Sequence, residues 1–178
     1  SLGGKFALYG GGEYENGINY MKNEEYVLKN ACLTAEGAVA ALENDNADSL
    51  IDKNILISGY GRIAKALHRL LAAYGSNITV CSRSAESAEL SSFYGASHIY
   101  FPELKKKNDF DIVINTVPHI VLTEAELKAL KKSVIILDLA SFPGGADTLM
   151  AASLGLKIIN GRGMPSKFTA KAAGEAIG

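Results

Sequence analysis

Three small residues at a fixed spacing, Gly59, Gly61 and Ala64, follow a short apolar run and precede an amphipathic segment. A nucleotide pyrophosphate needs bare backbone N–H groups and the positive end of a helix, and a strand–turn–helix unit supplies both. Gly59 allows a tight turn, Gly61 lacks a Cβ that would block a phosphate, and Ala64 lets the helix lie close to the strand. This pattern predicts a dinucleotide site whose contacts are Gly59, Tyr60, Gly61, Arg62 and Ile63.

The end of the second predicted strand indicates which dinucleotide is bound. NAD-binding units place an Asp or Glu about 20 residues after the glycines, on the ribose 2′-hydroxyl. Here the strand ends in Ser82, Arg83 and Ser84, without a carboxylate. A guanidinium pairs bidentately with phosphate oxygens, so this tip favours the 2′-phosphate of NADP, with NAD as the alternative cofactor. The alternative without a function is that Arg83 is solvated and simply precedes a helix that Ser84 caps.

A polar loop follows the fourth predicted strand, at the edge of the sheet where ligands bind in this class of fold. Asn115 and Thr116 could bond to the ribose or the nicotinamide, and Pro118 stiffens the loop. The alternative is a simple exit from the strand. The cofactor contacts predicted here are Asn115, Thr116, Val117 and Pro118.

Residues that could carry out proton chemistry lie on the same edge. Asp138 and Ser141 follow the fifth predicted strand, where a nicotinamide or substrate would lie, although Asp138 could instead cap the turn at Pro143–Gly145. His119 follows the Asn115–Pro118 loop and suits proton transfer near neutral pH, with a surface loop position as the alternative. Asp138, Ser141 and His119 are therefore the candidate catalytic residues.

The remaining basic side chains are interpreted more simply. Arg162, after the sixth predicted strand, could bind a substrate carboxylate or could be a surface arginine. His68 is expected on the polar face of the first helix and His98 at the start of a strand, neither with a functional role. Cys32, Cys81 and the three histidines lack metal-ligand spacing, so no metal site and a reduced cytoplasmic location are expected.

Alternating strand-like and helix-like segments position these groups. The periodicity predicts helices over residues 62–74, 84–94, 123–131 and 146–154. Strands apolar on both faces suit a parallel sheet covered by helices on both sides. The fold class is therefore α/β, a doubly wound parallel Rossmann sheet of order 3-2-1-4-5-6. The predicted strands are Asn54–Ser58, Asn77–Cys81, Ser97–Tyr100, Asp111–Asn115, Ser133–Asp138 and Lys157–Asn160.

The first fifty residues do not fit that unit. Strands are expected at Lys5–Tyr9 and Tyr26–Asn30, with a turn at Gly10–Gly12 between them. Thr34 is expected to cap a helix over 35–43, and Asn44–Ser49 is typical of a polar linker. The resulting division is a remnant of an N-terminal domain over residues 1–30, a crossing helix and linker over 31–50, and the nucleotide-binding domain over 51–178.

Composition narrows the possible partners. The 18 basic and 19 acidic residues nearly balance, which argues against nucleic-acid and membrane-surface binding. No apolar run reaches the roughly 18 residues of a membrane span. The opening residues lack an initiator Met and a signal peptide, so the native protein is expected to be longer. A small-molecule substrate is the expected partner.

Several segments, in order, resemble the A subunits of bacterial dipicolinate synthases, over about residues 25–178. The most specific is Leu137–Ser141 followed by Pro143–Gly145, and the Gly-rich turn is the least specific. Family members oxidise dihydrodipicolinate to dipicolinate in sporulation with NADP or NAD. The other matching segments are Thr34–Gly37, Gly59–Arg62, Ser82–Ser84, Ile114–Pro118 and Gly163–Gly174.

The resemblance also implies an N-terminal flavodoxin-like domain and pairing with the B subunit of dipicolinate synthase. Phe142 departs from the family, which often has a basic residue there, and most of the N-terminal domain is absent. The chain could therefore bind cofactor without turning over substrate. The substrate-facing residues that the resemblance implies are Thr34, Glu36, Arg162, Gly163, Met164 and Pro165.

Two other functions fit the same sequence. One is a different NAD(P)-dependent dehydrogenase of the shikimate or hydroxyacid type. The other is a non-catalytic dinucleotide-binding module that uses the helix over 35–43 to pack against a second copy as a homodimer. Sequence alone assigns no general base to any of the three.

Overall fold

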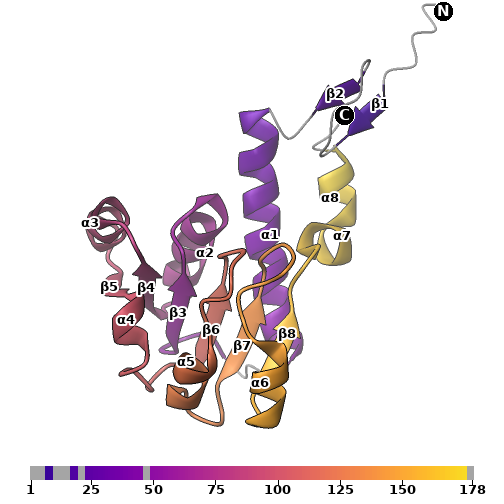
Figure 1. Ribbon diagram of the computed structural model, residues 1–178. Coiled ribbons are helices and arrows are strands. Elements are labelled where there is room, and N and C mark those ends of the chain that lie inside the picture. Colours follow the sequence, from indigo (N-terminus) through magenta and orange to yellow (C-terminus); the bar gives the residue numbers. More distant parts are fainter. Residues whose placement is uncertain (1–6, 10–16, 20–22, 46–48, 176–178) are drawn as a thin grey trace, which may run out of the picture.

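A parallel sheet of six strands forms the centre of the computed structural model, which describes residues 7–9, 17–19, 23–45 and 49–175 (Figure 1). The strand order is β5-β4-β3-β6-β7-β8. Renumbered from the first strand of this sheet, that is 3-2-1-4-5-6, so the predicted Rossmann topology is confirmed. The strands are β3 (Asn54–Ser58), β4 (Asn77–Ser82), β5 (Ser97–Tyr100), β6 (Ile112–Asn115), β7 (Ile135–Asp138) and β8 (Lys157–Asn160).

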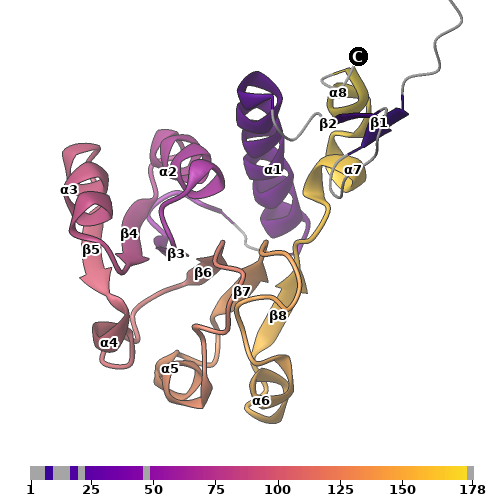
Figure 2. The same ribbon diagram turned by 45° about the horizontal axis from the view of Figure 1, so that its top comes forward.

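Helices cover both faces of this sheet, as a doubly wound fold requires. Figure 2 shows α1, α2 and α3 on one face and α4, α5 and α6 on the other, with α7 and α8 beside α1. Short α4 was not predicted from the sequence. The helices are α1 (Glu24–Asn44), α2 (Arg62–Ala73), α3 (Ala85–Phe93), α4 (Phe101–Leu104), α5 (Glu124–Ala129), α6 (Thr148–Ser153), α7 (Met164–Phe168) and α8 (Ala170–Glu175).

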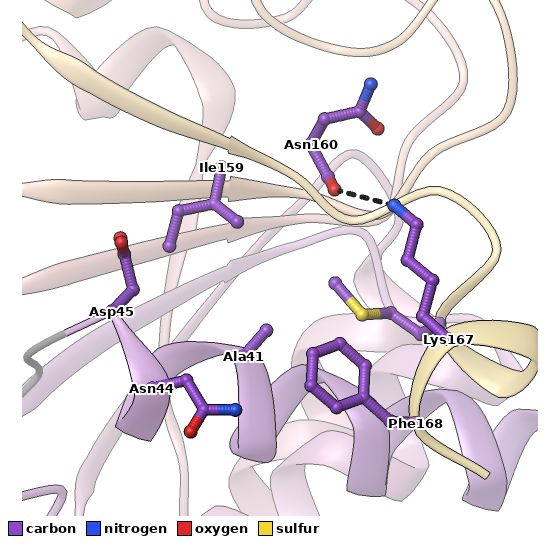
Figure 3. Close-up of a pocket in the computed structure, with 8 residues that line it drawn as sticks. Ala41, Asn44, Asp45, Ile159, Asn160, Lys167 and Phe168 are labelled. Atoms are coloured by element: carbon purple, nitrogen blue, oxygen red, sulfur yellow. Dashed lines mark hydrogen bonds between the residues drawn. The ribbon is translucent and has the colours of Figure 1, made fainter.

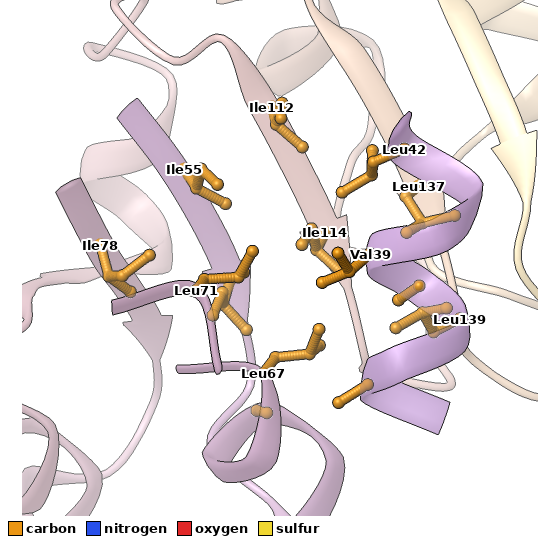
Figure 4. Close-up of a cluster of buried hydrophobic side chains, with 14 of the residues drawn as sticks. Val39, Leu42, Ile55, Leu67, Leu71, Ile78, Ile112, Ile114, Leu137 and Leu139 are labelled. Carbon is orange, nitrogen blue, oxygen red and sulfur yellow. The ribbon is translucent and has the colours of Figure 1, made fainter. Parts of the chain in front are cut away.

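The two faces of the sheet carry separate hydrophobic cores. On the α1 side, Ile55 of β3 packs in one cluster with Leu67 and Leu71 of α2 and with Val39 and Leu42 of α1 (Figure 4). On the opposite side, Leu56 belongs to a second cluster with side chains of β6, β7, α5 and α6. Burial on both faces explains why the strands are apolar at consecutive positions.

The N-terminal part corrects two expectations. The segment Tyr26–Asn30 is not a strand, because it lies within α1, and Thr34 is not a cap. The helix begins after Asn23, whose side chain accepts hydrogen bonds from the backbone N–H groups of Glu25 (2.9 Å) and Tyr26 (3.2 Å). The Thr34 hydroxyl instead donates to the carbonyl of Asn30 at 2.7 Å, inside the helix.

The start of the chain is described only in part. Strands β1 (Ala7–Tyr9) and β2 (Gly17–Asn19) pair in parallel as a separate two-stranded sheet. The Gly10–Gly12 turn and residues 46–48 of the predicted linker lie outside the described residues. The proposed boundary between residues 30 and 31 falls inside α1, and the three-part division remains a prediction. Within the described ranges, no helix combines the length and the apolar character that crossing a bilayer would require.

Candidate functional site

The glycine-rich turn between β3 and α2 has the shape that a phosphate needs. Gly59 adopts φ +84°, and a Cβ there would lie 2.8 Å from the hydroxyl oxygen of Thr116, so only glycine fits without strain. A Cβ on Gly61 would meet nothing within 4 Å. Gly61 is the N-cap of α2 and provides no side-chain cap, so the first N–H groups of the helix open onto this space. The residues present therefore fit a dinucleotide pyrophosphate.

Arg62, the first residue of α2, already has an acidic partner. Its Nε donates to Oε1 of Glu24 at 2.9 Å and its Nη2 to Oε2 at 2.8 Å, which joins the start of α1 to the start of α2. The hydrogen bonds to Glu24, and then the negative charge of Glu24, raise the pKa of Arg62. Both side chains remain more than half exposed. The guanidinium therefore lies at the phosphate end of the site, held by an exposed carboxylate.

The side chains of Tyr60 and Ile63 point into the protein. The Tyr60 hydroxyl lies 2.8 Å from Nδ1 of His68, and both side chains are buried. This corrects the expectation that His68 lies on the solvated face of α2; burial lowers its pKa and raises the pKa of Tyr60. Ile63 packs against the α1-side core. At residues 60 and 63, only backbone groups remain for a cofactor.

Of the three polar residues at the tip of β4, only Arg83 is free to meet a ligand. The hydroxyl of Ser82 is buried and lies 2.9 Å from Nε2 of His98. The hydroxyl of Ser84 caps α3, accepting from the backbone N–H of Ser87 at 3.1 Å. Arg83 lines a hollow of about 350 Å³ together with Phe101, Val117, His119, Ile120, Val121, Thr123 and Glu126. Arg83 and Val117, predicted to contact the cofactor, and His119, predicted to be catalytic, thus line one hollow, and their roles remain predictions.

A buried polar chain crosses the carboxyl ends of three strands. Ser58 Oγ of β3 donates to Oδ1 of Asn115 at 2.6 Å, and Nδ2 of Asn115 donates to Oδ1 of Asp138 at 2.8 Å. Asn115 also bonds to both the N–H and the carbonyl of Val117. Its amide is therefore engaged within the protein, and Ser58, which the sequence analysis missed, completes the chain. A serine ending an apolar strand next to the glycine turn was its only sequence signal.

Asp138 fixes the loop that follows β7. Its Oδ1 accepts from the N–H of Ala140 at 3.2 Å and its Oδ2 from the N–H of Gly145 at 2.9 Å. A Cβ on Gly145 would come within 1.9 Å of Nδ2 of Asn115, so the loop packs directly on the polar chain. The structure therefore gives Asp138 the capping role that was the alternative to catalysis. Its catalytic assignment remains a prediction.

Arg162 reaches the same loop from the end of β8. Its Nε donates to the carbonyl of Ala140 at 3.2 Å and its Nη2 to that of Pro143 at 2.9 Å. Its guanidinium carbon lies 5.8 Å from the centre of the Phe142 ring, which is 85% exposed. Arg162, Phe142 and the exposed Ser141 therefore lie together at the carboxyl edge, and Phe142 is a second residue that the sequence analysis did not select.

The other substrate candidates lie in different surroundings. Thr34 is buried in α1, and Glu36 is exposed on the same helix. Met164, expected to face the substrate, is the first residue of α7, and its side chain is buried against Gly37 of α1. Gly163 caps α7 with φ +69°, and Pro165 lies in the first turn of that helix. Thr116, Pro118 and His119 are at least partly exposed.

A second hollow, of about 260 Å³, lies between the end of α1, β8 and α7 (Figure 3). Nζ of Lys167 lies 3.4 Å from the carbonyl of Asn160, across its mouth. Except for Met164, none of its lining residues was predicted to bind cofactor or substrate. Its walls are formed by Ala41, Asn44, Asp45, Ile159, Asn160, Met164, Lys167 and Phe168.

Comparison with known proteins gives consistent relatives. The family described as "D-isomer specific 2-hydroxyacid dehydrogenase, NAD binding domain" matches residues 27–141. The A subunit of dipicolinate synthase from Bacillus subtilis (strain 168) is 29% identical over 161 residues, 90% of this chain and 54% of the relative. The shikimate dehydrogenase (NADP(+)) of Methanococcus maripaludis is 33% identical over 147 residues, 72% of this chain and 50% of the relative.

Solved structures agree with these matches. The A subunit of dipicolinate synthase from Bacillus halodurans has a TM-score of 0.89 at 24% identity, covering 96% of this chain and 62% of its own. The corresponding Bacillus subtilis structure has a TM-score of 0.85 at 28% identity, covering 90% and 54%. The resemblance to the A subunits of dipicolinate synthases is confirmed. The chain spans about half the length of the curated relatives it matches.

Proposed function

The chain belongs to the family of NAD-binding domains of D-isomer specific 2-hydroxyacid dehydrogenases, and we propose that it is the NADP-binding domain of an oxidoreductase similar to the A subunit of dipicolinate synthase. The proposal includes a small-molecule substrate, dihydrodipicolinate, oxidised to dipicolinate in sporulation. It also includes NAD as the weaker cofactor and the B subunit of the synthase as a partner. Since the chain spans 54% of the Bacillus subtilis relative, we propose that this domain binds the cofactor and that turnover of the substrate also needs the part of the enzyme that this chain does not cover.

The observation that carries the proposal is the open turn at Gly61 with a free guanidinium at the neighbouring strand tip. The uncapped N–H groups at the start of α2 would hold the pyrophosphate, and Arg62 would add positive charge beside it. Arg83, exposed in the hollow beside Val117, would bind the 2′-phosphate. When bound, the nicotinamide supplies the acceptor for a hydride from the substrate carbon, and a proton leaves to solvent or a base.

The other residues at the carboxyl edge of the sheet would orient the bound ring and the substrate. The chain of Ser58, Asn115 and Asp138 would keep the loops after β6 and β7 at a fixed separation, so that a ring bound between them has one orientation. Arg162 would attract a substrate carboxylate to this end of the site. His119 is exposed and lines the same hollow as Arg83, which supports a contact with the cofactor beside its predicted role in proton transfer.

The test is a titration of the chain with NADPH and NADH, in wild type and in Arg83→Ala. A charged hydrogen bond contributes about 1.5–3 kcal/mol, so the variant should lose roughly 10- to 100-fold in affinity for NADPH and little for NADH. Arg69→Ala, an exposed arginine on α2 outside the hollow, is the matched control and should bind both as wild type does. Equal wild-type affinity for NADPH and NADH would contradict the 2′-phosphate assignment.

A second candidate function is a shikimate-type NADP-dependent dehydrogenase, favoured by the 33% identity to the archaeal enzyme. The same cofactor edge would serve both reactions, so cofactor binding does not separate them. Binding of shikimate to the NADP⁺-loaded chain, with no binding of pyridine-2,6-dicarboxylate, would favour this function over the first.

A further inference from the structure

The loop between β7 and α6 has an anchored backbone and an exposed aromatic side chain. Two hydrogen bonds hold the backbone of this loop: the Asp138 carboxylate accepts from the N–H groups of Ala140 and Gly145. The carbonyl of Gly145 also accepts from the N–H groups of Val121 and Leu122, both at 2.9 Å. The ring of Phe142, at the top of this loop, is 85% exposed.

An exposed phenylalanine alone carries little meaning, because single apolar side chains are common on protein surfaces. Phe142 differs from Phe93, which is 81% exposed, in two respects. Its loop follows the carboxyl end of β7, where ligands bind in this class of fold, whereas Phe93 ends α3 at the opposite edge. A guanidinium also lies over its ring, 5.8 Å from the centre.

Arg162 places a guanidinium beside this ring without a direct ion pair, although Asp138 lies near it: a Cβ on Gly144 would lie 2.8 Å from Nη2 of Arg162 and 2.6 Å from Oδ2 of Asp138. The hydrogen bonds of Arg162 go to the carbonyls of Ala140 and Pro143. In the part of the chain that the structure describes, no carboxylate lies within ion-pair distance of it. An exposed aromatic ring beside a guanidinium that is in no direct ion pair is complementary to a planar ring that carries a carboxylate.

We propose that Phe142 and Arg162 form a platform that selects planar, conjugated carboxylates: the ligand ring stacks, offset, on the face of Phe142 over which Arg162 lies, and its carboxylate bonds to Arg162. This inference rests on the proposed function and adds to it a residue that determines specificity. It also explains how a site can favour an aromatic ring over a saturated one of the same charge, since only the flat ring gains the stacking contact.

Two ligands of equal charge test the platform: planar pyridine-2,6-dicarboxylate and saturated cis-cyclohexane-1,3-dicarboxylate, both dianions near neutral pH. Affinities are measured by calorimetry or ligand-detected NMR, with and without saturating NADP⁺. Wild type should prefer the planar ring by about 2- to 10-fold, the range expected for one aromatic pair. Phe142→Leu should lose this preference without weakening the saturated ligand, and Arg162→Lys should weaken both. Phe93→Leu is the matched control and should behave as wild type.

The outcomes separate this inference from the proposed function. If NADPH binds in an Arg83-dependent way but Phe142→Leu retains the preference for the planar ring, the platform is wrong and the cofactor proposal stands. Absence of pyridine-2,6-dicarboxylate binding to wild type, in either cofactor state, also overturns the platform. So does a dimer in sedimentation experiments that Phe142→Leu abolishes, because the ring would then be covered by a second copy.

Discussion

Asp138 is the acceptor at the centre of the site, and its removal should be costly. Asp138→Ala would remove the acceptors of the N–H groups of Ala140 and Gly145 and one of the two acceptors of Nδ2 of Asn115, in a buried place. Each buried unsatisfied donor costs about 1–3 kcal/mol, so with three donors we expect the free energy of unfolding to fall by at least about 3 kcal/mol.

Urea denaturation followed by circular dichroism measures this loss. Asp109→Ala removes an exposed carboxylate whose side chain is not needed for its one hydrogen bond, made by the backbone carbonyl, and should change the free energy of unfolding by less than about 0.5 kcal/mol. Equal stability of Asp138→Ala and Asp109→Ala would show that the loop after β7 is not held by this carboxylate.

For single residues, the sequence predicted the strand end on which they lie better than the groups to which their side chains bond. Arg83 and Val117 were expected to contact the cofactor; they line one hollow, and the cofactor contact remains a prediction. Ser82 and Asn115 were expected to face a ligand, yet both bond inward, because their partners His98 and Ser58 come from neighbouring strands. Sequence spacing shows which strand end carries a polar group, whereas its partner depends on the register of the sheet.

At the level of secondary structure, α1 shows where local preference misleads. Tyr and Val favour strands, so Tyr26–Asn30 suggested a short strand. The segment is helical because it continues a helix whose later turns pack on α2 and α7. Long-range packing of this kind is absent from a local window, and it outweighs a propensity difference of a few tenths of a kcal/mol per residue.

Gly37 permits the close approach of α1 and α7. A Cβ there would lie 2.9 Å from Cβ of Met164, so Gly37→Ala should push the two helices apart. Overpacking costs about 1–3 kcal/mol, and alanine regains up to about 1 kcal/mol of helix propensity. We therefore expect a net loss of about 1–2 kcal/mol in the free energy of unfolding by urea denaturation.

The matched control for this change is Gly174→Ala. Gly174 also lies in a helix, α8, but a Cβ there meets nothing within 4 Å. Only the propensity effect remains, so this variant should be equally stable or gain up to about 1 kcal/mol. If both alanine variants gain stability, the contact between α1 and α7 is not limited by Gly37.

For the protein as a whole, the topology was the most predictable property. Alternating strand and helix signals permit few arrangements, because parallel strands need right-handed crossovers and helices on both faces. The six-stranded order is one of the few that this constraint leaves. The pairing of α1 with α7 and the start of α7 at Met164 were not predictable, since they depend on contacts between residues more than 100 positions apart.

Titratable groups that are buried in this fold should make its free energy of unfolding depend on pH. Burial lowers the pKa of His68 below its usual 6.5. The unfolded chain then binds a proton that the folded chain does not, so the free energy of unfolding falls as pH drops below about 6.5. A series of urea denaturations between pH 5 and 8 should show this fall at low pH. Above about pH 7.5 His68 is deprotonated in both the folded and the unfolded chain, so it no longer makes the free energy of unfolding depend on pH.

The alkaline limb belongs to Cys81, on the opposite face of the sheet from His68. Burial, with repulsion from Glu103 and Glu126, raises the pKa of its thiol from 9.0 to about 12. Between these values the unfolded chain has lost a proton that the folded chain keeps, so stability falls as pH rises through this window. Cys81→Ala should flatten the fall between pH 8 and 10, whereas Cys32→Ala, an exposed cysteine, should leave it unchanged. An alkaline fall of equal slope in both variants would mean that the Cys81 thiol ionises as readily in the folded chain as in the unfolded one.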